Sequence, residues 1–131
     1  EDNIMLQRTT ISGEQRREPT THWYTDDYAD LYVWFDPAGA IDGFQLCYNK
    51  ARDEHSLTWK RVSGYTHNRI DAGDDSPLRN ETPIVLPDGL CPLDQLRREF
   101  TRRSEKIEPS ARAFILAALD PALHPELRHL Q

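Results

Sequence analysis

The chain has 131 residues, a hydrophobic fraction of 37% and a formal net charge of −6 at pH 7, which suits one globular domain with one core. Its 3 Trp, 5 Tyr and 4 Phe exclude a wholly disordered chain, and its acidic balance disfavours nucleic acid as a partner. No apolar run approaches the roughly 18 residues that a membrane span needs, and no secretory signal is apparent, so a cytoplasmic protein without a membrane partner is expected.

The first 22 residues lack a sustained apolar period and predict a mobile arm, with at most one edge strand. Residues 31–35 are apolar throughout and predict a central strand. Asp36, Pro37 and Gly39 suit a type I turn, and residues 41–48 alternate apolar and polar side chains after it. These elements predict a first hairpin.

A second hairpin is predicted from residues 56–61 and 65–70, joined by a Ser-Gly turn. An acidic loop follows at 71–77, and the short, proline-bounded run at 82–86 suits an edge strand. From residue 93 the apolar period changes to about 3.6, which predicts an amphipathic helix over 93–106. A second helix is expected from Pro109, and a single helical turn at 125–130.

Hairpins followed by helices favour the α+β class. We expect an antiparallel sheet of about four to five strands, made of two successive hairpins and packed by two C-terminal helices. The predicted organisation is an arm over residues 1–22 and a single domain over 23–131. The two cysteines, Cys47 and Cys91, belong to no CxxC pair, so two buried thiols are expected, while a disulfide between them stays open.

Histidines and carboxylates gather near the predicted hairpins and are the candidates for chemistry. Divalent cations prefer convergent carboxylate and imidazole ligands, and acid/base catalysis uses the same groups. The candidate catalytic residues are His55, His67, Asp53 and Asp71, and the candidate metal ligands are Asp26, Asp27, His55 and His67. The alternative is that short acidic clusters at strand ends serve turns and solubility.

Tyr65, His67 and Arg69 alternate along one predicted strand and could line a pocket for an anionic ligand, although an exposed sheet face requires the same pattern. Aromatic side chains, Trp34 among them, could supply a binding surface, because aromatic anchors dominate interface hot spots. The arginines of the 93–106 helix could contact phosphate or an acidic partner, or pair with the glutamates of the same helix.

Residues 23–71 include WYTDDYADLYVWFDPAGAIDGFQLCYNKARDEHSLTW and a later GYTHNRID. This stretch resembles a family of short bacterial proteins of unknown function. The resemblance implies a bacterial, cytoplasmic, single-domain protein, and it implies no activity, cofactor or site residue.

Two functions from different classes follow from the residues. The leading hypothesis is a noncatalytic binding or interaction module, with homodimerisation through its sheet as one form of it, because the chain is rich in aromatic residues and lacks P-loop, GxGxxG, GxSxG and HExxH motifs. The alternative is a small metal-assisted or acid/base hydrolase that uses the histidines and carboxylates named above. No cofactor is expected.

Overall fold

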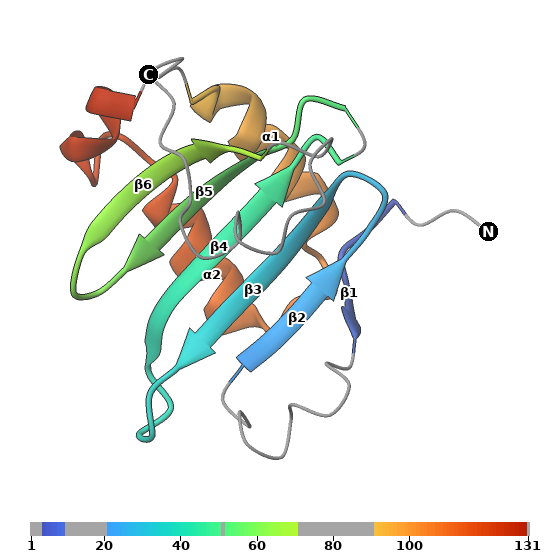
Figure 1. The fold of residues 1–131 in the computed structure, drawn as a ribbon. Helices are drawn as coiled ribbons and strands as arrows, with labels where there is room; N and C mark the ends of the chain where they lie inside the picture. The colour runs from blue at the N-terminus through green and yellow to red at the C-terminus, as the bar shows by residue number, and fades with distance from the viewer. Residues whose placement is uncertain (1–3, 10–20, 51, 71–90, 131) are drawn as a thin grey trace.

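The computed structural model describes residues 4–9, 21–50, 52–70 and 91–130. A six-stranded antiparallel sheet forms one layer, and two helices lie behind it on one face (Figure 1). The strands follow one another across the sheet in chain order, β1 to β6, so that each strand pairs with its neighbours in sequence. The α+β class is thereby confirmed.

The sheet has more strands than the four to five expected from the sequence. The additional pairing comes from β1 (Gln7–Thr9) and β2 (Thr21–Thr25), which precede the first predicted hairpin. Neither segment shows apolar alternation, because β1 is short and β2 carries polar or aromatic side chains on both faces. The edge strand predicted at 82–86 lies outside the described residues.

The first hairpin consists of β3 (Ala29–Phe35) and β4 (Ile41–Tyr48) and is confirmed. Its turn depends on Asp36, whose carboxylate oxygen accepts hydrogen bonds from the backbone N–H groups of Ala38 and Ala40, both at 2.9 Å. Gly39 takes a φ of 93°, a left-handed conformation that glycine adopts without steric cost. The DPAG sequence therefore fixes this turn through its own local chemistry.

The second hairpin joins β5 (His55–Lys60) to β6 (Gly64–Arg69) and is likewise confirmed. Strand β5 also pairs with β4, so the two hairpins form a continuous meander. Since side chains alternate across a sheet, the register decides which of them face the helices. Leu31, Leu46, Leu57 and His67 stand in one such row beneath the helices.

Helices α1 (Leu93–Arg103) and α2 (Pro109–Ala118) cover this face, and a short 3-10 helix, η2 (Pro125–Leu130), follows. Helix α1 buries Leu93, Leu96 and Phe100, the three positions that define its apolar period. Glu108 caps α2 by accepting a hydrogen bond from the N–H of Ala111 at 3.0 Å. The core therefore lies between the helices and one face of the sheet. No helix among the described residues is long and apolar enough to cross a membrane.

Cys47 and Cys91 are both buried and both free, as expected. They lie on opposite faces of the sheet, because Cys91 hydrogen-bonds to Tyr48, whose side chain points away from that of the adjacent Cys47. Burial raises the pKa of each thiol to about 12, and the Tyr48 hydrogen bond offsets part of the rise at Cys91.

Because the thiolate is the reactive form, we expect neither cysteine to react with a thiol reagent such as DTNB at pH 8 in the folded protein. In denaturant, both thiols should react rapidly with the reagent. Counting the released chromophore per chain under each condition checks this expectation. Rapid reaction of one thiol without denaturant would show that the fold opens around it.

Candidate functional site

The structure brings His55 and His67 together, as the acid/base hypothesis requires. They lie on neighbouring strands β5 and β6 as diagonal neighbours, since His55 pairs with Arg69 and His67 pairs with Leu57, on the face that the helices cover. Their rings are stacked with centroids 5.2 Å apart and planes within 11°. Both side chains are buried, at 7% and 5% exposure. The two imidazoles therefore share a face, a condition that the acid/base hypothesis needs.

Tyr48 and Cys91 complete a buried polar group that we call the tyrosine–histidine cluster: Tyr48, His55, His67 and Cys91. The Tyr48 hydroxyl lies 2.6 Å from Nε2 of His67 and also hydrogen-bonds to the Cys91 thiol. Tyr48 and Cys91 are each 2% exposed. A phenol, two imidazoles and a thiol therefore meet beneath the start of α1.

The protonation of His55 follows from its partner. Its Nδ1 lies 2.9 Å from the backbone carbonyl of Asp53, and a carbonyl can only accept, so Nδ1 carries a hydrogen. In the neutral ring Nε2 is then the basic nitrogen. The cluster has the group types of a proton relay, since phenol and imidazole both donate and accept.

Three of the predicted carboxylates, those of Asp26, Asp27 and Asp53, lie elsewhere in the part of the chain that the structure describes. Asp26 is completely buried, and both Asp26 and Asp27 are bound to Arg103, whose guanidinium lies 3.1 and 2.8 Å from their oxygens. The Asp53 side chain is exposed, and only its backbone carbonyl touches His55. Asp71 lies outside the described residues. Within the described ranges, no three His, Cys, Asp or Glu side chains are grouped as a metal site.

Tyr65 and Arg69 share the face of His67, but the helices cover that face, so the alternative of a solvated sheet face does not hold for Tyr65 and His67. The Tyr65 hydroxyl donates to the carbonyl of Ala118 at the end of α2, at 2.6 Å. Arg69 is exposed at the end of β6. Tyr65 therefore anchors a helix rather than opening toward a ligand.

Trp34 lies on the opposite face of the sheet, which no helix of the described chain covers. Trp23 and Tyr32 stand on the same face and are stacked, with centroids 5.7 Å apart. The Lys60 ammonium sits 5.7 Å from the centre of the Trp34 ring. All three rings are half-buried, so much of their surface is already in contact with neighbours.

A groove with aromatic walls opens at the end of the sheet where the β3–β4 and β5–β6 turns lie. Its volume is about 400 Å³. We call it the aromatic groove; its lining residues are Phe35, Gly39, Ala40, Ile41, Trp59, Arg61, Ser110 and Phe114. The rings of Trp59 and Phe114 meet at 5.3 Å across it, and Phe114 remains 36% exposed. Beside it, Val62 is 91% exposed.

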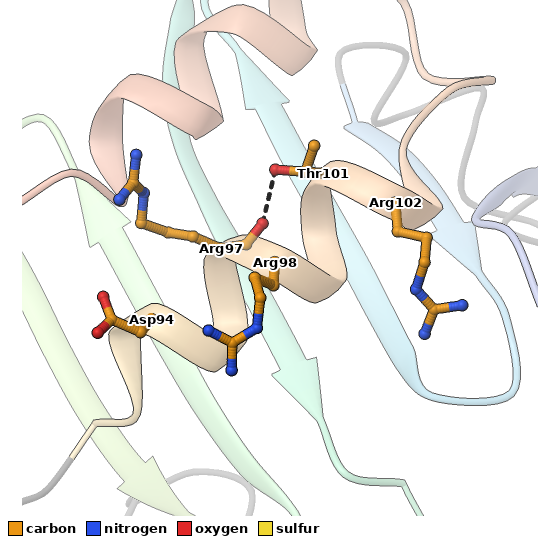
Figure 2. A pocket seen from close by; sticks show the side chains of 5 residues that line it. All are labelled: Asp94, Arg97, Arg98, Thr101 and Arg102. Carbon is orange, nitrogen blue, oxygen red and sulfur yellow. Dashed lines mark hydrogen bonds between the residues drawn. The ribbon is translucent and has the colours of Figure 1, made fainter.

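The outer side of α1 carries a second open depression, of about 430 Å³, lined by Asp94, Arg97, Arg98, Thr101 and Arg102 (Figure 2). The Thr101 hydroxyl is turned inward and donates to the carbonyl of Arg97 at 2.7 Å. Of the pairings expected within this helix, Arg102 and Arg103 both bind Glu99, at 2.7 and 2.8 Å.

Sequence reasoning did not include Tyr48, Cys91 or Phe114 in a site. A tyrosine at the end of an apolar strand gives no signal of its own, because the same residue type fills cores. Phe114 precedes the buried Ile115, and this adjacency could have indicated that one of the two faces outward.

Comparison with protein-family models, with curated proteins and with solved structures finds no match to this chain in any of the three.

Proposed function

We propose that this protein is a noncatalytic interaction module that associates with a second copy of itself through the aromatic groove. The observation that supports this most directly is the exposure of large apolar side chains around one open, aromatic-walled groove. Apolar surface that is concave and rimmed by polar groups is typical of binding sites in soluble proteins. Arg61 and Ser110 supply the polar rim here.

The groove is a better contact surface than the helix-free face of the sheet. On that face, Trp23 and Tyr32 already stack on each other, and Lys60 covers Trp34. In the groove, Phe114 keeps an open ring face although it sits in the middle of α2. Burying such a side chain fully contributes about 1.5–3 kcal/mol.

A second copy suits the groove because a projecting and a receiving element lie next to each other. Val62, at the tip of the β5–β6 turn, is almost completely exposed and follows Arg61, which lines the groove. A two-fold interface uses the same patch on both subunits, so each patch must be self-complementary. If Val62 of each copy enters the groove of the other, the same contact forms at two symmetric positions and the patch is self-complementary.

We expect Val62→Asp and Phe114→Ser each to shift the protein toward the monomer, because each removes an apolar contact at both symmetric positions. Loss of about 1–2 kcal/mol per site would weaken dimerisation by roughly tenfold or more. Sedimentation equilibrium or light scattering between 10 µM and 1 mM measures the change. Leu123→Asp is the matched control, because Leu123 is 61% exposed and does not line the groove.

A strict monomer across that range in the unchanged protein would contradict the proposal. So would an equal loss of association in Leu123→Asp, since that result would indicate nonspecific apolar contact.

The tyrosine–histidine cluster supports a second candidate, an acid/base enzyme. The observation that favours this candidate is the 2.6 Å distance between the Tyr48 hydroxyl and Nε2 of His67, with the imidazole of His55 stacked on that of His67. Such groups transfer protons when a substrate reaches them. The cluster is at most 7% exposed, so this function requires an opening movement near the start of α1.

A thermal-shift series with EDTA and then Mg, Mn, Zn, Ca and Ni tests the metal-assisted form of this candidate. A ligand at a hundredfold excess over its Kd stabilises the folded state by about 2.7 kcal/mol. A selective rise in Tm that is lost in both His55→Ala and His67→Ala would favour the enzyme over the interaction module. No shift with any ion would remove the metal-assisted form.

A further inference from the structure

The depression on α1 stands apart from the aromatic groove and shares no residue with it. Three of its five lining side chains are guanidinium groups, and Figure 2 shows Arg98 between Asp94 and Arg102 on the outer side of the helix. We call Arg97, Arg98 and Arg102 the arginine face. It is a concentrated positive surface on a chain whose net charge is −6.

The arginine face holds hydrogen-bond donors that the described chain does not use. Arg98 makes no hydrogen bond or ion pair with any described residue. Nε of Arg97 is buried without a hydrogen-bond partner among the described residues, and a carboxylate oxygen of Asp120 lies 3.9 Å from another nitrogen of the same guanidinium group. That atom is enclosed by the protein, so an acceptor on a partner would meet the outer nitrogens of the Arg97 side chain, which is 40% exposed.

Two other arginines are more fully paired with carboxylates than those of the arginine face. Arg103 binds Glu99, Asp26 and Asp27, while Arg61 binds Asp42 at 3.1 Å. Arg102 shares the single Glu99 carboxylate with Arg103. Among the described residues, Arg97 and Arg102 each have one carboxylate partner, on Asp120 and Glu99, and Arg98 has none. The positive charge of Arg98 is therefore the one that this face offers to a partner.

We propose that the arginine face binds an acidic segment of a partner protein through carboxylate–guanidinium pairs. Arg98 and Arg102 are four residues apart on a helix, so their side chains are neighbours that match two carboxylates at the same spacing. Asp94 bounds the face at the start of the helix and repels a carboxylate placed there. A nucleic acid fits less well, because three arginines neutralise few phosphates and the rest of the chain is acidic.

The probe is a fluorescein-labelled helical peptide with glutamates every fourth residue, and the control peptide has glutamine at those positions. Anisotropy is measured with the full chain at 20 and 200 mM NaCl. We expect binding of the glutamate peptide that weakens with salt, and none of the glutamine peptide. Arg98→Gln combined with Arg102→Gln should weaken binding by about tenfold, as expected for two exposed ion pairs.

Arg52→Gln combined with Lys106→Gln is the matched control. Both residues are exposed, line no part of the depression and change the net charge equally. We expect this pair to alter binding by less than twofold. If the double arginine variant is unstable by its melting curve, Arg98→Glu alone replaces it, with the same expected direction.

Three results would overturn the proposal: no binding of the glutamate peptide up to 1 mM at 20 mM NaCl, equal losses in the two double variants, or equal binding of the glutamine peptide. Tighter binding of a labelled single-stranded 20-mer DNA than of the glutamate peptide would also overturn it, in favour of phosphate recognition. Because the aromatic groove is untouched in these variants, dimerisation should be unchanged, so this proposal and the self-association proposal can fail separately.

Discussion

Replacement of Arg103 by methionine is expected to lower the free energy of unfolding by about 3–5 kcal/mol, the usual cost of removing one partner from a buried ion pair. Arg103 is 12% exposed and contacts Glu99, Asp26 and Asp27. Its guanidinium also lies 4.6 Å from the centre of the Tyr28 ring. Removing it would leave the carboxylate of Asp26, at 0% exposure, without its positive partner.

Urea denaturation followed by tryptophan fluorescence measures this loss. Arg98→Met is the matched control, because Arg98 lies on the same helix, is exposed and has no ion pair with a described residue. It should change stability by less than about 0.5 kcal/mol. A similar loss of stability in both variants would contradict the assignment. It would mean that the loss comes from the removed charge or from helix propensity, and not from the contacts of Arg103.

The ion pair between Arg103 and Glu99 also makes the stability of the fold depend on pH. Hydrogen bonds from Arg103 lower the pKa of Glu99 below its ordinary value, so the stabilisation is present above about pH 4.3 and is lost as pH falls through the folded-state pKa. Arg103→Met should therefore lose less stability between pH 5 and 3 than the unchanged protein does. An identical slope in the two proteins would contradict this assignment.

Gly43→Val is expected to destabilise the fold by about 1–3 kcal/mol, the typical cost of overpacking. Gly43 is buried in β4 between Trp34 and Lys60 of the neighbouring strands. A Cβ atom there would lie 2.7 Å from the backbone oxygen of Trp59 and 3.2 Å from the Trp34 ring. Backbone cannot move aside as a flexible side chain can, so the sheet itself must shift.

Thr58→Val is the matched control, since it adds valine to the adjacent strand on the same face, where a side chain is already accommodated. Its stability should change by less than about 0.5 kcal/mol. Thermal or urea unfolding compares the two. Unchanged stability in Gly43→Val would mean that β4 relaxes away from Trp59, since valine otherwise favours strands more than glycine does.

Much of the fold could be predicted from the sequence where local chemistry decides it. The Asp36 turn is specified by side-chain hydrogen bonds within five residues, and α1 by the apolar period of Leu93, Leu96 and Phe100. Strands β1 and β2 could not be predicted in this way. The pairing of Arg8 with Tyr24 depends on partners that are distant along the chain.

The candidate site was predicted only in part, for a similar reason. Alternation placed His67 on the face of Tyr65, but it could not say that helices cover this face. The contact between Tyr48 and Cys91 depends on where α1 begins above the sheet, which no local pattern encodes. Likewise, Asp26 and Asp27 suggested metal ligands because nothing in the sequence marks Arg103, 77 residues from Asp26, as their partner.

The meander also shapes how the chain folds. Because each strand pairs with its sequence neighbour, most of the sheet can form by successive short loop closures, which is typical of rapid folding. The contact between Arg103 and the carbonyl of Ile4 is different, since it joins residues 99 positions apart. Closing a loop of that length costs about 4 kcal/mol in entropy. The contact of the segment before β1 with α1 should therefore form last. The Leu6 N–H, which donates to the carbonyl of Arg103 at 2.9 Å, should exchange its hydrogen sooner than the amide of Leu46 in the centre of the sheet.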